Sequence, residues 1–183
     1  MGYEAAMNIQ GDVCMKVVQK KICLLGEFAV GKTSLVRRYV EGRFSEEYLS
    51  TIGAQVSRKV LMRGDHELHL MVWDLVGGSE FSRREAGYLL GTSGALIVCD
   101  LTRPETLEAV ISYANRLRAV NPMAAIVFVG NKVDLKAERA IDDESLFAVC
   151  HPFSKQVVLT SAKTGEMVEE AFALLADILE GNV

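Results

Sequence analysis

One segment constrains this chain more than any other feature, because its glycines and its basic residue have the spacing G-x-x-x-x-G-K-T. It spans residues 26–33, after an apolar run at 21–25 that predicts a strand and before a helical pattern at 32–40. Glycines let the backbone curl so that successive N–H groups face inward, and the helix start adds positive charge. This pattern predicts a phosphate-binding loop, with Lys32 on the β- and γ-phosphates and the Thr33 hydroxyl on Mg²⁺. The predicted phosphate-binding residues are Gly26, Glu27, Phe28, Ala29, Val30, Gly31, Lys32, Thr33 and Ser34.

Apolar runs alternate with amphipathic segments along the chain, which indicates an α/β fold. Strands are expected at residues 21–25, 55–62, 68–74, 95–99, 125–129 and 157–159, and helices at 32–40, 107–117, 145–150 and 168–179. Continuous apolar strands alternating with helices predict a mostly parallel six-stranded sheet with helices on both faces. A turn at Gly64-Asp65 predicts one antiparallel strand. Before the helix at 107–117, Thr102 and Glu105 predict a capping box, and Pro104 fits its first turn.

Composition narrows the class of protein. Half of the 183 residues are hydrophobic, which fits a single domain, and we expect it at residues 17–183 after a loose extension at residues 1–16. The net charge of −4 argues against a nucleic-acid partner. No apolar run approaches the roughly 20 residues that span a bilayer. Cys23 and Cys99 lie in apolar runs, which predicts reduced, buried thiols and a cytoplasmic location.

Polar residues follow two further predicted strands, where ligands bind in parallel sheets. These residues are Asn131, Lys132, Asp134 and Leu135 after one strand, and Ser161, Ala162 and Lys163 after the other. The Asp134 carboxylate could accept hydrogen bonds from N1–H and the 2-amino group of guanine, whereas adenine has no donors there. We expect Asn131 to brace the neighbouring loops, the Lys132 stem to lie over the base, and the Ala162 N–H to donate to guanine O6.

With these motifs the chain resembles the Ras-like small GTPases, over nearly its whole length. It is most similar to the Rab branch, through Tyr48-Leu49-Ser50-Thr51-Ile52-Gly53 and Trp73-Asp74. The resemblance implies a small G domain that binds GTP or GDP with Mg²⁺. It implies that Phe44 packs against the base edge and that Thr51 binds Mg²⁺ and the γ-phosphate. It also implies that Asp74 holds Mg²⁺ through water and that the Gly77 N–H meets the γ-phosphate.

The sequence departs from the family pattern at two positions that concern hydrolysis. Gly78 stands where relatives carry a glutamine that orients the attacking water. The candidate catalytic residues are Lys32, Thr51, Gly77 and Gly78. Arg83 and Arg84 are near in sequence, although a solvated helix face explains them as well. Phe28 stands where several relatives carry a small residue, and it either crowds the γ-phosphate or points away and shields the nucleotide.

The family resemblance also implies partners and a location. We expect a monomer that meets an exchange factor, an activating protein and effectors through the segments from Tyr48 to Gly53 and from Gly77 to Tyr88. Relatives end in lipid-modified cysteines, whereas this chain ends Leu179-Glu180-Gly181-Asn182-Val183. No lipid anchor is visible, and we expect a cytoplasmic protein, peripheral to membranes if an anchor follows in a longer chain.

Three functions fit the sequence to different degrees. The first is a switch that hydrolyses GTP slowly and in which Thr51 and Gly77 hold two loops around the γ-phosphate. The second is a GTP-binding scaffold with little or no hydrolysis, which Gly78 favours. The third, a phosphotransferase, would leave Asn131 and Asp134 without a role. Because Thr33, Thr51, Asp74 and Gly77 are present, the switch is the leading hypothesis.

Overall fold

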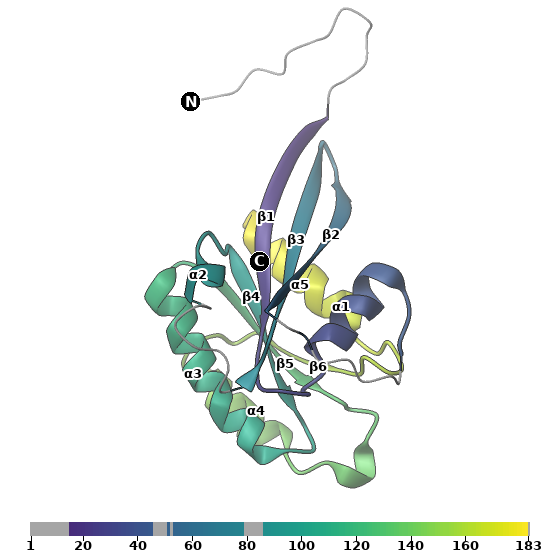
Figure 1. Cartoon of the computed structure of the whole chain (residues 1–183), viewed down its shortest axis with the longest axis vertical. Coiled ribbons are helices and arrows are strands. Elements are labelled where there is room, and N and C mark those ends of the chain that lie inside the picture. The colour runs from purple at the N-terminus through teal and green to yellow at the C-terminus, as the bar shows by residue number, and fades with distance from the viewer. Residues whose placement is uncertain (1–14, 46–50, 52, 79–85, 183) are drawn as a thin grey trace, which may run out of the picture.

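The computed structural model describes residues 15–45, 51, 53–78 and 86–182. Its strands are β1 (Lys16–Leu25), β2 (Ala54–Arg63), β3 (His66–Leu75), β4 (Gly94–Asp100), β5 (Ala125–Asn131) and β6 (Val157–Thr160). They form one sheet in the order β2-β3-β1-β4-β5-β6 (Figure 1). Only the β2–β3 pair is antiparallel in this sheet, so the predicted mostly parallel six-stranded sheet is confirmed.

Helices cover both faces of the sheet, as predicted. They are α1 (Lys32–Glu41), α2 (Ala86–Leu89), α3 (Pro104–Val120), α4 (Asp143–Cys150) and α5 (Val168–Glu180), with a short 3₁₀ helix η2 (Lys136–Glu138). Figure 1 shows α1 and α5 on one face and α2, α3 and α4 on the other. On the α1–α5 face, Tyr39 stacks on Phe172 with ring centroids 3.9 Å apart. On the opposite face, Val110 and Leu117 of α3 share a buried cluster with Leu146 of α4.

The Gly64-Asp65 turn joins β2 to β3 as a tight hairpin, because Arg63 pairs directly with His66 across the two strands. The adjacent strand β1 starts earlier than predicted, at Lys16, and pairs with β3 from its first residue. The first half of β1 is largely exposed, so it carries no continuous apolar run that would mark it as a strand. Together these three strands extend well beyond the helices (Figure 1).

The capping box expected before α3 is wrong. The N-cap is Arg103, it makes no side-chain cap hydrogen bond, and the helix begins at Pro104. The Thr102 hydroxyl donates instead to Oδ1 of Asp100 at 2.7 Å. Because Asp100 is completely buried at the end of β4, its carboxylate needs donors and takes this one.

The sequence analysis also made predictions about buried cysteines and about membrane-spanning segments. Cys23, Cys99 and Cys150 are free and buried, which confirms the prediction for the first two, whereas Cys14 lies outside the described residues. No helix in the described part of the chain has the length and apolar character needed to cross a membrane.

Candidate functional site

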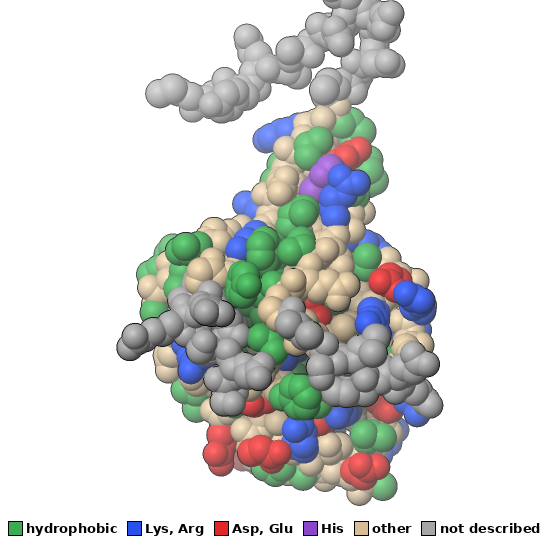
Figure 2. All heavy atoms as spheres, in the orientation of Figure 1, with side chains coloured by type: hydrophobic (Ala, Val, Ile, Leu, Met, Phe, Trp, Pro, Cys, Tyr) green, Lys and Arg blue, Asp and Glu red, His purple; other side chains and the backbone are tan. Residues whose placement is uncertain are grey.

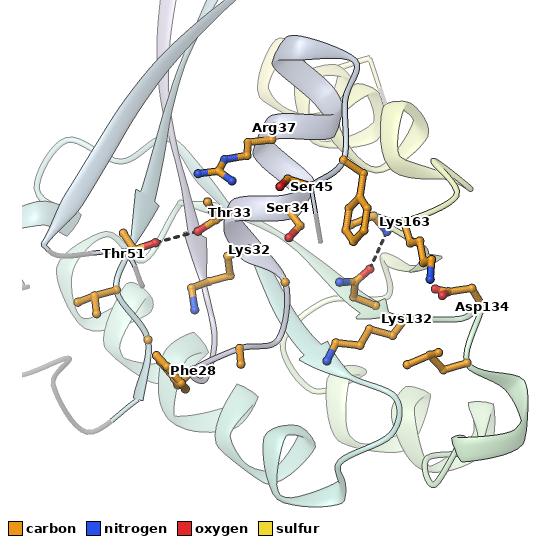
Figure 3. A pocket seen from close by; sticks show the side chains of 18 of the residues that line it. Phe28, Lys32, Thr33, Ser34, Arg37, Ser45, Thr51, Lys132, Asp134 and Lys163 are labelled. Atoms are coloured by element: carbon orange, nitrogen blue, oxygen red, sulfur yellow. Dashed lines mark hydrogen bonds between the residues drawn. The ribbon is translucent and has the colours of Figure 1, made fainter. Parts of the chain in front are cut away.

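A cavity of about 420 Å³ lies beyond the carboxyl ends of β1, β3, β5 and β6, and the loops after these strands line it (Figure 3). Parallel strands end at the same edge of a sheet, which brings the separate motifs together. The predicted residues that line the cavity are Phe28, Ala29, Gly31, Lys32, Thr33, Ser34, Phe44, Thr51, Gly77, Asn131, Lys132, Asp134, Leu135, Ala162 and Lys163. Of the other predicted residues, Gly26 lies two residues before Phe28, and the rest are direct chain neighbours of lining residues: Glu27, Val30, Asp74, Gly78 and Ser161.

The loop between β1 and α1 depends on two glycines. Gly26 has φ +142°, and a Cβ at this position would lie 2.2 Å from the Val98 carbonyl oxygen. Gly31 has φ +101° at the N-cap of α1, and a Cβ there would lie 2.3 Å from Nδ2 of Asn131. Side chains are excluded at both positions by conformation and by space. The loop therefore curls closely against β4 and β5 and leaves its concave side to a ligand.

Lys32, the first residue of α1, is almost fully buried and directs its ammonium group into this loop. Its ammonium donates hydrogen bonds to the carbonyl oxygens of Gly26 and Glu27, both at 2.8 Å. Burial lowers the pKa of Lys32 to about 8, although the nearby Asp74 carboxylate acts in the opposite direction. A buried cation held only by carbonyl oxygens is under-compensated, which favours an anionic ligand beside it.

Three oxygen-bearing side chains converge beside the phosphate loop. The Thr33 hydroxyl donates to Oδ2 of Asp74 at 2.5 Å and lies 2.8 Å from the Thr51 hydroxyl (Figure 3). Oδ1 of Asp74 is buried and has no hydrogen-bond partner among the described residues. Burial raises the pKa of Asp74, and the hydrogen bond from Thr33 and the charge of Lys32 act against that rise.

These oxygens fit a hard cation. Mg²⁺ prefers oxygen ligands and is usually held by one or two carboxylates, with phosphate and water completing its shell. The unpartnered Asp74 oxygen beside two hydroxyls matches that requirement. Among the described residues no group of three or more His, Cys, Asp or Glu side chains could hold a metal, so a metal site here relies on Thr33, Thr51 and Asp74.

Asn131 connects the loops that would surround a base. Its Nδ2 donates to the Val30 carbonyl oxygen at 2.9 Å, and its Oδ1 accepts from the Thr160 hydroxyl at 3.1 Å. The Ala162 N–H, expected to donate to guanine O6, donates to the same Oδ1 at 3.2 Å. This bond is long, and a base oxygen could share or replace it. Asn131 therefore joins the phosphate loop to the loop after β6.

Asp134 and Lys132 lie on the same side of the cavity as Lys163, opposite Phe28 (Figure 3). The Lys132 ammonium pairs with Oδ2 of the buried Asp100 at 2.6 Å, which fixes the direction of its stem. Burial acts to raise the pKa of Asp100, but hydrogen bonds from Lys132 and Thr102 hold that pKa below its usual value.

Several residues around the cavity were not identified from the sequence. Arg38 donates to the Ala162 carbonyl oxygen at 3.0 Å and to that of Lys163, which ties α1 to the loop after β6. Arg103 donates to Oδ2 of Asp100 at 2.9 Å and to the Phe28 carbonyl oxygen at 2.8 Å. Apart from the Arg103–Asp100 pair, these contacts join residues far apart in the chain, and no local pattern indicates them.

Arg37 is a further lining residue that the sequence analysis missed. A signal for it existed, since Arg37 follows the predicted metal ligand Thr33 by one helical turn and so shares its face of α1.

The loop after β3 contacts the phosphate loop directly. Gly77 is buried, and a Cβ on it would lie 2.4 Å from both the Gly26 carbonyl oxygen and the Lys32 ammonium. A glycine is therefore required at position 77. The next N–H, that of Gly78, donates to the Tyr113 hydroxyl at 3.0 Å, and this hydroxyl in turn donates to the Glu27 carboxylate at 3.1 Å.

Phe28 lies at the rim of the cavity, on the side of Lys32 that faces away from Asp134 (Figure 3). It is 49% exposed, yet it lines the cavity, so it neither fills the phosphate site nor points fully away. The remaining segments named in the sequence analysis, residues 48–50, Ile52 and 79–85 with Arg83 and Arg84, lie outside the described residues.

Fold and cavity together define a P-loop nucleotide-binding domain, with a phosphate loop, a metal-ligand set and a base-binding loop at one sheet edge. Residues 21–180 match the model of the Ras family, and the chain belongs to that family. It is therefore a protein of the small-GTPase type, a class whose members bind GTP and GDP with Mg²⁺ and act as nucleotide-dependent switches.

Proposed function

We propose that this protein is a GTP/GDP switch with slow intrinsic hydrolysis. The convergence of Thr33, Thr51 and Asp74 carries the proposal, because these residues come from three separate segments and meet at one point beside the phosphate loop. Thr51 and Gly77 lie in the two loops that would respond to the γ-phosphate. Their positions would be held when it is bound and released when it is lost.

Each nucleotide group has protein residues suited to it. Loop N–H groups and Lys32 suit the phosphates, while Asp134, Lys132 and Phe44 surround the end of the cavity assigned to guanine. Thr33, Thr51 and Asp74 would hold Mg²⁺, which when bound neutralises charge on the β- and γ-phosphates.

A second candidate is a GTP-binding scaffold that barely hydrolyses its ligand. Gly78 has no side chain to orient water, and its N–H is already bonded to Tyr113. To separate the two candidates, the nucleotide bound after purification is extracted and identified, and the conversion of protein-bound GTP is followed over a day. Slow conversion of GTP to GDP supports the switch, and unchanged GTP supports the scaffold.

The metal assignment has its own test. Nucleotide release is timed with and without a chelator in the wild type, in Thr33→Ala and in Thr33→Ser, which keeps the hydroxyl. We expect chelation to speed release from the wild type and from Thr33→Ser, and Thr33→Ala to release quickly under both conditions. If chelation leaves the wild-type rate unchanged, the metal role is wrong.

Partners and location follow from the family resemblance. Exposed apolar side chains on one face of the edge strand β2, those of Val56, Val60 and Met62, offer a surface on the strand that follows residues 48–53 in the sequence. Figure 2 shows apolar side chains gathered over the β1–β3 part of the sheet. We assign this surface to effectors, and the Rab-like motifs at residues 48–53 and 73–74 agree with that assignment. Reduced, buried cysteines support a cytoplasmic location.

A further inference from the structure

The nucleotide cavity contains a cation that the family motifs do not include. Arg37 of α1 lines the cavity, and Figure 3 shows it extending along the side where Thr33 and Thr51 lie. Its positive charge acts on the Asp74 carboxylate. A guanidinium group therefore lies near the end of the cavity where the metal ligands meet.

Helix geometry explains why the Arg37 guanidinium group lies near the metal ligands. Thr33 and Arg37 are four residues apart in α1, so they occupy the same helix face on successive turns. Side chains in a helix lean toward its N-terminus, which here is the phosphate end. The long Arg37 side chain therefore reaches back toward the position of Thr33.

The other cations at this site already have protein acceptors. Lys32 bonds to two carbonyl oxygens, and Lys132 pairs with Asp100. Arg38 donates to the carbonyl oxygens of Ala162 and Lys163. Arg37, by contrast, makes no hydrogen bond or ion pair to any residue that the structure describes, although it faces the cavity. A guanidinium group in this position is suited to a phosphate, which it can bind through two N–H groups at once.

We propose that Arg37 binds the γ-phosphate end of the nucleotide and favours the triphosphate over the diphosphate. The proposal rests on the proposed function, since it assumes that the cavity holds a guanine nucleotide. An added cation near the last phosphate stabilises the more highly charged ligand more strongly, by Coulomb's law. During hydrolysis, the Arg37 guanidinium group would stand on the Thr51 side of the γ-phosphate. The positive charge there would come from this chain and not from a partner protein.

The test compares the affinities of GDP and of a non-hydrolysable GTP analogue, both with Mg²⁺, in the wild type and in variants. In Arg37→Ala we expect the analogue to bind about tenfold more weakly and GDP to change by less than about threefold. Arg37→Lys should recover part of the preference, because it keeps the charge but not the paired N–H groups. Arg37→Gln keeps much of the length and reports the loss of charge if the alanine variant folds poorly.

Arg43→Ala is the matched control. Arg43 follows α1, is 73% exposed at its side chain and pairs with Glu41, so its removal changes the net charge equally without touching the cavity. We expect the control to leave the affinity ratio unchanged. An unchanged ratio in Arg37→Ala and Arg37→Gln, or an equal loss for both nucleotides, would overturn the inference. If the wild type binds no guanine nucleotide, the proposed function itself fails, and that result is distinct from either outcome.

Discussion

The backbone N–H of Gly78 donates a hydrogen bond to the Tyr113 hydroxyl at 3.0 Å, which joins the loop after β3 to α3. The same hydroxyl donates to Oε1 of Glu27 in the phosphate loop. One phenol thus connects three segments at the edge of the nucleotide site. Burial, together with the nearby Glu27 carboxylate, raises the pKa of Tyr113 to about 12, so the hydroxyl keeps its proton at physiological pH.

Removing this hydroxyl should destabilise the protein. In Tyr113→Phe the Gly78 N–H and the Glu27 carboxylate lose their partner, and we expect a loss of about 1–2 kcal/mol in the free energy of unfolding. Urea denaturation of nucleotide-free protein measures it. Tyr39→Phe is the control, because the Tyr39 hydroxyl makes no side-chain hydrogen bond within the described residues, and it should change stability by less than about 0.5 kcal/mol. Equal effects in the two variants would contradict the prediction.

The motifs that form the cavity could be found from the sequence because each is local. Each motif follows a strand with a clear apolar run, and parallel strands end at the same edge of the sheet. The motifs are residues 26–31, 131–134 and 161–163. The contacts of Tyr113 could not be found in this way. Tyr113 lies 35 residues from Gly78 and 86 from Glu27, and its position depends on how α3 packs on the sheet.

Two further features could not be predicted from the sequence because a buried or remote partner decides them. Thr102 has the sequence context of a helix cap, but the fully buried Asp100 carboxylate takes its hydroxyl. The early start of β1 at Lys16 was missed because pairing with β3, and not burial, makes that half a strand. In both cases the deciding partner is remote or buried, which no local pattern reveals.

Nucleotide binding should take up protons near pH 8. Burial lowers the pKa of Lys32 to about 8 in the ligand-free protein, and bound phosphates would raise it by adding negative charge. Binding is then strongest below that pKa, and affinity falls as pH rises through it. We expect uptake of about half a proton per GDP at pH 8 and about a tenth at pH 7. Calorimetry in two buffers of different ionisation enthalpy measures this uptake, and identical heats at pH 8 would refute it.

Guanine selectivity should depend on Asp134. Its carboxylate can accept from two guanine donors, and Asp134→Asn turns one acceptor into a donor that faces them. We expect GTP to bind at least about 2 kcal/mol more weakly, with xanthine nucleotides relatively favoured, because unpaired buried polar groups cost about 1–3 kcal/mol each. Competition binding with GTP, xanthosine triphosphate and ATP measures it. Asp143→Asn, an equal charge change at the exposed start of α4, should leave all three affinities unchanged. Equal wild-type affinity for ATP and GTP would remove the assignment.

The last prediction concerns the rate of hydrolysis. Positioning and charge stabilisation account for nearly all of the catalysis of phosphoryl transfer, and Gly78 has no side chain with which to position water. Single turnovers of the wild type, followed by phosphate release, should be slower than roughly 10⁻³ s⁻¹. Gly78→Gln supplies the missing amide, but it has two obstacles. Gly78 has φ +87°, which costs a non-glycine residue about 1–2 kcal/mol. A Cβ there would also be in van der Waals contact with Phe28, 3.6 Å from its Cβ, so the rest of a glutamine side chain would compete with the phenylalanine for space.

We therefore expect Gly78→Gln alone to speed hydrolysis little, and Phe28→Gly with Gly78→Gln to speed it about tenfold or more. Phe28→Gly alone is the control for added space without the amide, and it should stay at the wild-type rate. If Gly78→Gln alone is as fast as the double variant, the phenylalanine does not block the amide. If the wild type already completes several turnovers per minute without a partner, another residue orients the water, and the role assigned to position 78 is wrong.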